Sequence, residues 1–176
     1  MTGNLLTKRE AAASISPQIL ITTLMETTDT LQLIKYALKL LSQRDHFRSE
    51  IISKLKAKKA TIAQIEEVIE YLNKFKYIND IKTLSKFAEE ISSSGRGVNY
   101  FKKKLYDKGA LELFSRDVFS VETEIAAAEI FIKKLKTSDG NEILRKLLSR
   151  GFSNEAVFLI LKKLKKGEVL ENRSDF

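Results

Sequence analysis

The sequence predicts an all-α protein made of three tandem three-helix repeats, stacked into an elongated or curved chain. One proline and seven glycines in 176 residues leave few helix breakers. Apolar residues recur at spacings of three and four, and no stretch alternates with a period of two for long enough to form a strand. A short basic segment also occurs in three similar copies, which indicates an internal repeat.

The first 29 residues precede the first clear helical pattern. They are rich in Ser and Thr and contain the only proline, Pro17, so we expect a flexible N-terminal arm over residues 1–29. The apolar run at residues 19–21 is too short for a secretory signal, and no run of about 18 apolar residues is present to span a membrane. These features predict a cytoplasmic protein.

Four apolar stripes with helical spacing follow the arm. They consist of Leu31, Ile34, Leu38 and Leu41; of Ile62, Ile65, Val68, Ile69, Leu72 and Phe75; of Leu84, Phe87 and Ile91; and of Val121, Ile125, Ala128, Ile132 and Leu135. Thr61 and Ser153 stand where helix N-caps are expected, before the second stripe and before a final amphipathic segment that ends near Leu164.

Three shorter segments, residues 49–59, 100–109 and 142–151, resemble one another. Each holds a basic residue, a leucine, two variable residues and a second basic residue, and the leucines are 105 − 55 = 50 and 147 − 105 = 42 residues apart. This is the period of a supersecondary unit. We therefore expect repeats at residues 30–79, 80–119 and 120–166 and a C-terminal tail at 167–176. Units of about 45 residues bury too little surface alone, so neighbours should stack.

The composition favours a binding protein over an enzyme. There are 31 Lys and Arg against 23 Asp and Glu, a formal charge of +8, which favours polyanionic or acidic partners. The absence of cysteine excludes disulfides and thiolate metal sites, and the single histidine, His46, leaves no histidine pair for zinc and no Ser-His-Asp triad. Carboxylates such as Glu66 and Glu89 fall on polar helix faces. We expect no catalytic residue, no metal and no cofactor.

The repeated basic residues are the candidate binding residues. They come in pairs four residues apart and hence on one helix face. The pairs are Lys54 and Lys58, Lys104 and Lys108, and Lys146 and Arg150, and the further candidates are Arg96, Lys102, Lys103 and Arg145. A basic stripe would suit phosphates or an acidic protein groove, whereas the alternative interpretation is a set of ordinary solvated lysines.

Two features near these bases have competing interpretations. Residues 92–97 (SSSGRG) could cradle a phosphate with their backbone amides, but a plain interhelical turn is the simpler interpretation. Tyr100 and Tyr106 flank three lysines and could stack on bases, whereas Phe101 belongs to the core stripe.

The order and spacing of several motifs resemble the RecX family of regulatory proteins, from about Leu31 to Leu164. The strongest matches are residues 36–45 (YALKLLSQRD), 48–51 (RSEI), 54–55 (KL), 77–80 (YIND), 95–97 (GRG), 104–105 (KL) and 108–109 (KG). Departures include Asn79 for an aspartate, Thr83 and Leu84 for Arg-Phe, and Lys59 and Ala60 near the usual Gly-Phe, which survives as Gly151 and Phe152.

The resemblance implies three three-helix repeats that bind the RecA nucleoprotein filament and inhibit its recombinase, ATPase and coprotease activities in DNA repair and the SOS response. We expect a monomer, with contacts to single- or double-stranded DNA as a further possibility. Two alternatives stay open, a sequence-nonspecific DNA-binding module and a helical protein-interaction scaffold.

Overall fold

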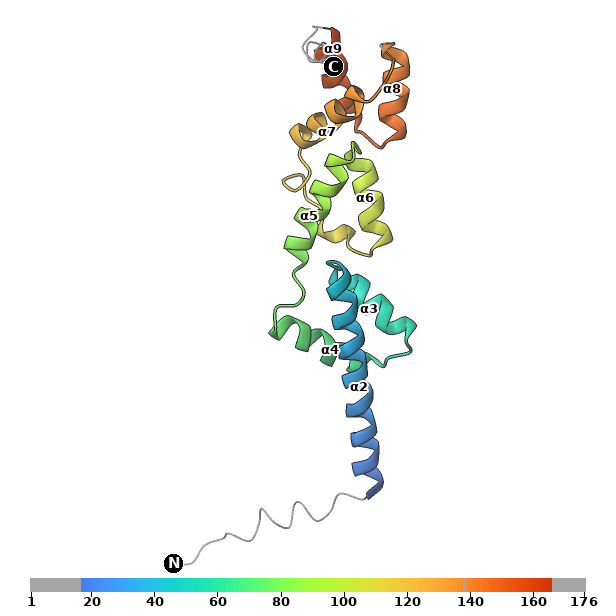
Figure 1. Cartoon of the computed structure of the whole chain (residues 1–176), viewed down its shortest axis with the longest axis vertical. Coiled ribbons are helices and arrows are strands. Elements are labelled where there is room, and N and C mark those ends of the chain that lie inside the picture. Colours follow the sequence, from blue (N-terminus) through green and yellow to red (C-terminus); the bar gives the residue numbers. More distant parts are fainter. Residues whose placement is uncertain (1–16, 138, 166–176) are drawn as a thin grey trace, which may run out of the picture. The chain divides into compact units, whose positions relative to one another are not determined.

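The computed structural model describes residues 17–137 and 139–165, and all regular structure in that part of the chain is helical (Figure 1). The all-α prediction is therefore confirmed. The elements are α2 (Pro17–Gln43), α3 (Arg48–Ala57), α4 (Ile62–Lys74), α5 (Asp80–Ser93), α6 (Val98–Asp107), the 3₁₀ turn η1 (Leu111–Leu113), α7 (Val121–Lys133), α8 (Gly140–Ser149) and α9 (Asn154–Lys165).

Helix α2 begins inside the segment that the sequence assigned to a flexible arm. Residues 17–29 are helical, and Pro17 stands at the first helical position. Proline suits that position because its missing N–H would have no partner within the helix. The prediction of an arm therefore concerns residues 1–16, which lie outside the described residues, as does the expected tail at 167–176.

The helices follow the expected triplets, with one difference in the second repeat. Helices α2 to α4 and α7 to α9 make complete triplets, whereas η1, a single 3₁₀ turn, takes the place of a third helix after α5 and α6. The chain is extended again at Phe114 and must reach Ser120, which caps α7. This interval is too short for a further α-helix.

The chain divides into two compact units. One contains the described residues up to Arg44 together with Ile52–Tyr77, and the other contains Asp45–Ile51 together with the described residues from Ile78 onwards. In the first unit α2 packs on α4 through Ile65, Val68, Ile69 and Leu72. The expected elongated or curved stacking stays a prediction.

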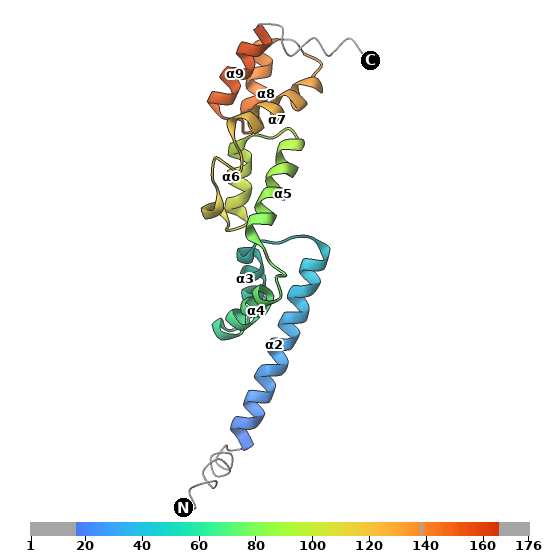
Figure 2. The ribbon, with the colours of Figure 1, turned by 90° about the vertical axis from the view of Figure 1, so that its left-hand side faces the viewer.

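Two apolar clusters form the core of the second unit. Phe101 and Phe119, with ring centroids 5.0 Å apart, are fully buried at the centre of one cluster, beneath α5 and α6. Phe152 and Ile160 are buried in the other, around which α7, α8 and α9 lie together (Figure 2). The expected core position of Phe101 is confirmed.

Three residues of the predicted apolar stripes are exposed. Leu31, Ile62 and Phe75 are 58%, 75% and 53% exposed. Ile62 and Phe75 stand at the two ends of α4, where the helix no longer faces its neighbour. The apolar stripes predicted the buried helix faces correctly, but they did not predict that these residues are exposed.

The three middle helices, α3, α6 and α8, end in the same way. After each, one residue has a left-handed backbone, with φ of 62° at Lys59, 64° at Gly109 and 80° at Gly151. The next amide then donates back to the repeated leucine, the six-residue bond of a Schellman motif. These bonds run from Ala60 to Leu55 at 3.2 Å, from Ala110 to Leu105 at 2.9 Å and from Phe152 to Leu147 at 3.3 Å. The leucines that revealed the repeat are therefore structurally equivalent.

Candidate functional site

The second and third repeats meet in the second unit through direct backbone contact. The Gly97 amide donates to the Arg150 carbonyl at 3.2 Å, and the Asn99 amide donates to the Gly151 carbonyl at 2.8 Å. A Cβ atom at Gly97 would lie 2.3 Å from the Cα of Phe152, so only glycine permits this approach. Gly97 is therefore a packing requirement of the junction.

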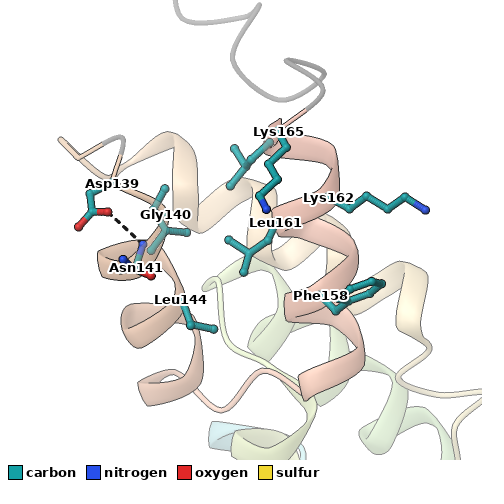
Figure 3. Close-up of a pocket in the computed structure, with 10 residues that line it drawn as sticks. Asp139, Gly140, Asn141, Leu144, Phe158, Leu161, Lys162 and Lys165 are labelled. Atoms are coloured by element: carbon teal, nitrogen blue, oxygen red, sulfur yellow. Dashed lines mark hydrogen bonds between the residues drawn. The ribbon is translucent and has the colours of Figure 1, made fainter.

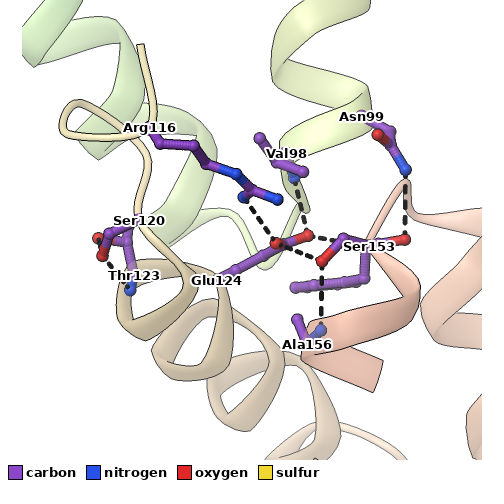
Figure 4. Close-up of polar contacts among 9 residues, drawn as sticks. Val98, Asn99, Arg116, Ser120, Thr123, Glu124, Ser153 and Ala156 are labelled. Atoms are coloured by element: carbon purple, nitrogen blue, oxygen red, sulfur yellow. Dashed lines mark hydrogen bonds and ion pairs between the residues drawn. The ribbon is translucent and has the colours of Figure 1, made fainter. Parts of the chain in front are cut away.

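A buried carboxylate holds the same junction together (Figure 4). Glu124 of α7 is fully buried, and its Oε1 accepts hydrogen bonds from the Val98 amide at 3.1 Å and the Ser153 amide at 2.5 Å. Its Oε2 accepts from the Ser153 hydroxyl at 2.7 Å and lies 3.6 Å from the Arg116 guanidinium. The carboxylate thus meets the positive N-terminal ends of α6 and α9, where negative charge is stabilised.

Sequence reasoning missed Glu124, although one signal was present. The residue lies three positions after Val121 and four before Ala128, and hence on the apolar stripe of α7. A carboxylate on an apolar face indicates a buried partner, because an unpaired charge is too costly to bury.

The phosphate-cradle interpretation of residues 92–97 is wrong. Every backbone amide from Gly95 to Asn99 already has an acceptor within the protein. The acceptors are the Ser92 carbonyl for Gly95, the Ile91 carbonyl for Arg96, the Arg150 carbonyl for Gly97, the Glu124 carboxylate for Val98 and the Gly151 carbonyl for Asn99. The segment is an interhelical turn with no amide left to bind an anion.

Side chains at this junction nevertheless form a cationic surface, which we call the junction cluster: Arg96, Tyr100, Lys104 and Arg150. The Arg96 guanidinium lies over the Tyr100 ring at 4.6 Å, and the Lys104 ammonium lies 5.6 Å from the same ring centroid. Arg150, whose carbonyl accepts the Gly97 amide, lies close to Arg96 in space, and partial burial and then repulsion from Arg96 lower the pKa of Arg150. The tertiary fold therefore brings together three basic candidates from two repeats.

The junction cluster is deficient in negative partners. Among the described residues neither arginine forms a salt bridge, and Lys104 has only Asp107 at 3.7 Å, an exposed pair that contributes little. Two cations that repel each other without a carboxylate between them favour binding of an anion. Phosphate groups or acidic side chains of a partner are the ligands that fit.

The second base of each repeated pair has an intramolecular role. Lys58, Lys108 and Arg150 lie over aromatic rings of the first helix in their own repeat. The rings are Tyr36 at 5.2 Å, Phe87 at 5.4 Å and Phe131 at 4.1 Å. Cations over aromatic faces stabilise the fold by about 0.5 to 1 kcal/mol each where they are exposed.

The other predicted bases are distributed over several environments. Lys108 also donates to Glu50 at 2.9 Å with both side chains mostly buried, and Lys146 donates to Glu142 at 2.6 Å, which lowers the pKa of that carboxyl. Lys102 lies over Phe114 at 4.5 Å, and the Arg145 side chain donates to a backbone carbonyl of its own helix. Lys103 is exposed on α6, whereas Lys54 and Lys58 belong to the other compact unit.

The two tyrosines differ in their surroundings. Tyr100 lies between Arg96 and Lys104, while Tyr106 is 72% exposed.

His46 is buried at the junction between α2 and α3, as expected of a residue between helices. In residues 17–137 and 139–165 no group of His, Asp and Glu is arranged to hold a metal ion. No helix in that part of the chain is long and apolar enough to cross a membrane.

Known proteins of one family share this sequence and fold. The family model for the first three-helix domain of RecX matches residues 34–72. A regulatory protein RecX from Haemophilus ducreyi is 30% identical over 129 residues, which cover 69% of this chain and 85% of the relative. Another, from Chlorobium phaeobacteroides, is 26% identical over 141 residues, covering 76% and 93%.

Solved structures show the same fold. The crystal structure of RecX from Lactobacillus salivarius superimposes with a TM-score of 0.61 at 24% identity, covering 80% of this chain and 99% of that one. A second crystal structure of a regulatory protein RecX superimposes with a TM-score of 0.67 at 15% identity, covering 85% and 80%. By sequence and by fold, this chain belongs to the RecX family of regulatory proteins.

Proposed function

We propose that this protein is a non-enzymatic, cytoplasmic regulator that binds the RecA nucleoprotein filament and restrains its recombinase, ATPase and coprotease activities. Membership of the RecX family supports the partner. The observation that carries the proposal at residue level is the junction cluster, where Arg96 and Arg150 converge from separate repeats without a carboxylate partner. We infer that this surface contacts acidic side chains or DNA phosphates of the filament.

The physical basis is a set of modest contacts instead of one deep pocket. Repeat proteins present side chains from successive units along an extended partner, so each unit adds a small share of the affinity. Charge-assisted hydrogen bonds from arginine contribute roughly 1.5 to 3 kcal/mol each when the partner is ionised. Loss of one such arginine should therefore weaken binding by about tenfold or more.

The test is the DNA-dependent ATPase of the RecA from the same organism, titrated with this protein while binding to naked single-stranded DNA is followed in parallel. We expect inhibition at less than one protein per RecA, without comparably tight binding to naked DNA. The R96Q and R150Q variants should raise the half-inhibitory concentration by about tenfold. The matched control is K133Q, which removes one positive charge from an exposed position on α7.

Stability measurements separate a binding role from a structural one. R96Q removes the repulsion from Arg150 but also the contact of the Arg96 guanidinium with the Tyr100 ring, so it should change the midpoint of thermal unfolding only slightly. Full inhibition by both arginine variants would remove the junction cluster from the interface. No effect of the wild-type protein on RecA would contradict the proposed function itself.

A sequence-nonspecific DNA-binding module is the second candidate, favoured by the position of Tyr100 between two cations. In that case naked DNA should bind as tightly as the filament, and its affinity should fall steeply with salt concentration. Stacking of a base on the ring would make a Y100A variant lose affinity for single-stranded DNA, by about 1 to 3 kcal/mol. A helical scaffold for another protein predicts neither RecA inhibition nor DNA binding.

A further inference from the structure

The first helix of one repeat caps the middle helix of the repeat before it, in the same way at both internal junctions. The Arg48 amide of α3 donates to the Asp80 carboxylate of α5 at 2.8 Å, and the Val98 amide of α6 donates to the Glu124 carboxylate of α7 at 3.1 Å. Arg48 and Val98 are equivalent, since each stands seven residues before its repeated leucine. Consecutive repeats are therefore joined by one recurring contact.

The two capping carboxylates also occupy equivalent positions. The second base of the repeated pair lies over Phe87 in the second repeat and over Phe131 in the third. Asp80 stands seven residues before Phe87, and Glu124 stands seven residues before Phe131. The aromatic ring under the repeated base thus gives the register of each first helix.

The first repeat has a carboxylate at this position too. Lys58 lies over the Tyr36 ring of α2 at 5.2 Å, and Asp29 stands seven residues before Tyr36. Asp29 is exposed, and its carboxylate has no hydrogen bond or ion pair with another described residue. Among the described residues no middle helix precedes Asp29. This cap therefore has nothing to cap within its own chain.

The third repeat presents the complementary surface. Gly140, the first residue of α8, stands seven residues before Leu147, which is the position of the two capped residues. The Asp139 carboxylate accepts from the Asn141 amide at 3.1 Å, and the Gly140 amide has no acceptor among the described residues. A groove of about 770 Å³ begins here and runs between α8 and α9 (Figure 3).

The groove has an apolar floor and a basic rim. Leu144 of α8 faces Leu161 of α9, and Phe158, 67% exposed, extends the apolar surface. Lys162 and Lys165 complete the lining on the α9 side, and neither forms a salt bridge with another described residue. The groove therefore suits an apolar helix that carries acidic residues and no basic ones.

The beginning of α2 has that composition. Helix α2 begins at Pro17, twelve residues before Asp29, whereas α5 begins at Asp80 itself and α7 begins three residues before Glu124. Residues 17–28 (PQILITTLMETT) include five large apolar residues and one glutamate, but no lysine or arginine. Twelve helical residues span about 18 Å, which matches the length of about 15 Å of the ten-residue α8.

We propose that copies of this chain associate head to tail, with Asp29 of one copy capping the Gly140 amide of the next. The contact repeats between copies the junction that Asp80 and Glu124 make within the chain. It joins two different surfaces, so it leaves a free end on each dimer and allows further copies to add. The inference does not depend on the RecA filament as the partner.

Sedimentation velocity of the full-length chain tests the association. The interface is small, so we expect monomers at about 1 µM and head-to-tail dimers and longer arrays at about 100 µM and above. D29A removes the cap and should raise the apparent dissociation constant about tenfold. The matched control is E66A, which removes an exposed carboxylate from α4 and should leave the association unchanged.

Two substitutions at Gly140 separate the hydrogen bond from the fold of α8. Proline is favoured at the first helical position because the helix does not use that N–H. Asp139, with ψ of 118°, already has the extended backbone that a following proline requires, and a Cβ atom at Gly140 meets nothing within 4 Å. G140P therefore removes the donor and should weaken the association about tenfold, whereas G140A keeps the donor and should leave it unchanged.

A mixture of the two variants tests the direction of the contact. D29A retains the Gly140 surface and G140P retains Asp29, so an equimolar mixture should form dimers that do not grow, at concentrations where each variant alone is monomeric. A wild-type chain that stays monomeric or stops at the dimer would overturn the proposal. Association that both variants leave unchanged, equal losses in G140P and G140A, or a mixture without dimers would also overturn it.

Discussion

Replacing Glu124 with alanine should loosen the junction between the second and third repeats more than any other single carboxylate change. The substitution removes the acceptor of the Val98 amide, of the Ser153 amide and of the Ser153 hydroxyl. A buried backbone donor left without a partner costs about 1 to 3 kcal/mol. Two stranded amides, together with the lost stabilisation of two helix N-termini, give a total of about 3 to 5 kcal/mol.

The conservative variant E124Q separates the loss of the amide hydrogen bonds from the loss of the negative charge. In E124Q the side-chain oxygen still accepts both amides, but the new NH₂ group faces the Ser153 hydroxyl and the Arg116 guanidinium, which is itself a donor. We expect a cost of about 1 to 2 kcal/mol. Glu122 lies on the same helix but is exposed, so E122A should lower the free energy of unfolding far less than E124A and serves as the control.

Urea unfolding followed by circular dichroism gives the overall cost, and amide exchange locates it. Exchange should accelerate in the first turns of α6 and α9, which Glu124 caps, and not in α4 of the other compact unit. For a chain of this length each kcal/mol shifts the unfolding midpoint by about 2 to 4 °C, so E124A should melt about 10 °C lower. A loss below about 1 kcal/mol, or acceleration shared equally with α4, would refute the reasoning.

Three further predictions concern the backbone and one ion pair. K59G should stabilise the protein by about 1 kcal/mol in urea unfolding, because Lys59 holds a left-handed φ of 62°, whereas K56G inside α3 should cost a similar amount. G97A should destabilise by at least about 3 kcal/mol by thermal unfolding, since its Cβ meets backbone, while G140A, with nothing within 4 Å, should be neutral. A hydrogen bond from Lys86 lowers the pKa of Asp45. The stabilisation that this ion pair gives the fold is therefore present at neutral pH and is lost as the Asp45 carboxylate is protonated below about pH 4. D45N should remove this pH dependence of the free energy of unfolding. The effect is under about 1 kcal/mol because the ion pair is exposed, and acid titrations of the wild type and of D45N measure it.

The secondary structure and the repeat were readable from the sequence because their causes are local. Helical spacing of apolar residues and the scarcity of breakers decide the fold class within each stretch of ten to twenty residues. The recurring Leu55, Leu105 and Leu147 identified the repeat because each is buried and receives the same Schellman bond. The departure from three helices in the second repeat also has a local cause, since the 3₁₀ turn η1 replaces a helix where the chain must turn towards Ser120.

The candidate site was only partly predictable. Arg96, Lys104 and Arg150 were identified as bases, but their convergence depends on a junction between residues about 50 positions apart. Lys108 looked equivalent to Arg150 in sequence, yet its ammonium is paired with Glu50, which is 58 positions away. Charge and helical spacing cannot show which lysine finds an internal partner.

The sequence by itself determined the helical class, the three repeated units and the family, since each depends on residue types at short spacings. Only the tertiary structure decided that Glu124 is a buried cap and that Gly97 permits two backbones to touch. It also decided which bases gather around Tyr100 and which, like Lys108, pack on an aromatic ring of a neighbouring helix. The physical reason is that burial and pairing belong to atoms far apart in the chain, and folding alone brings those atoms within hydrogen-bonding distance.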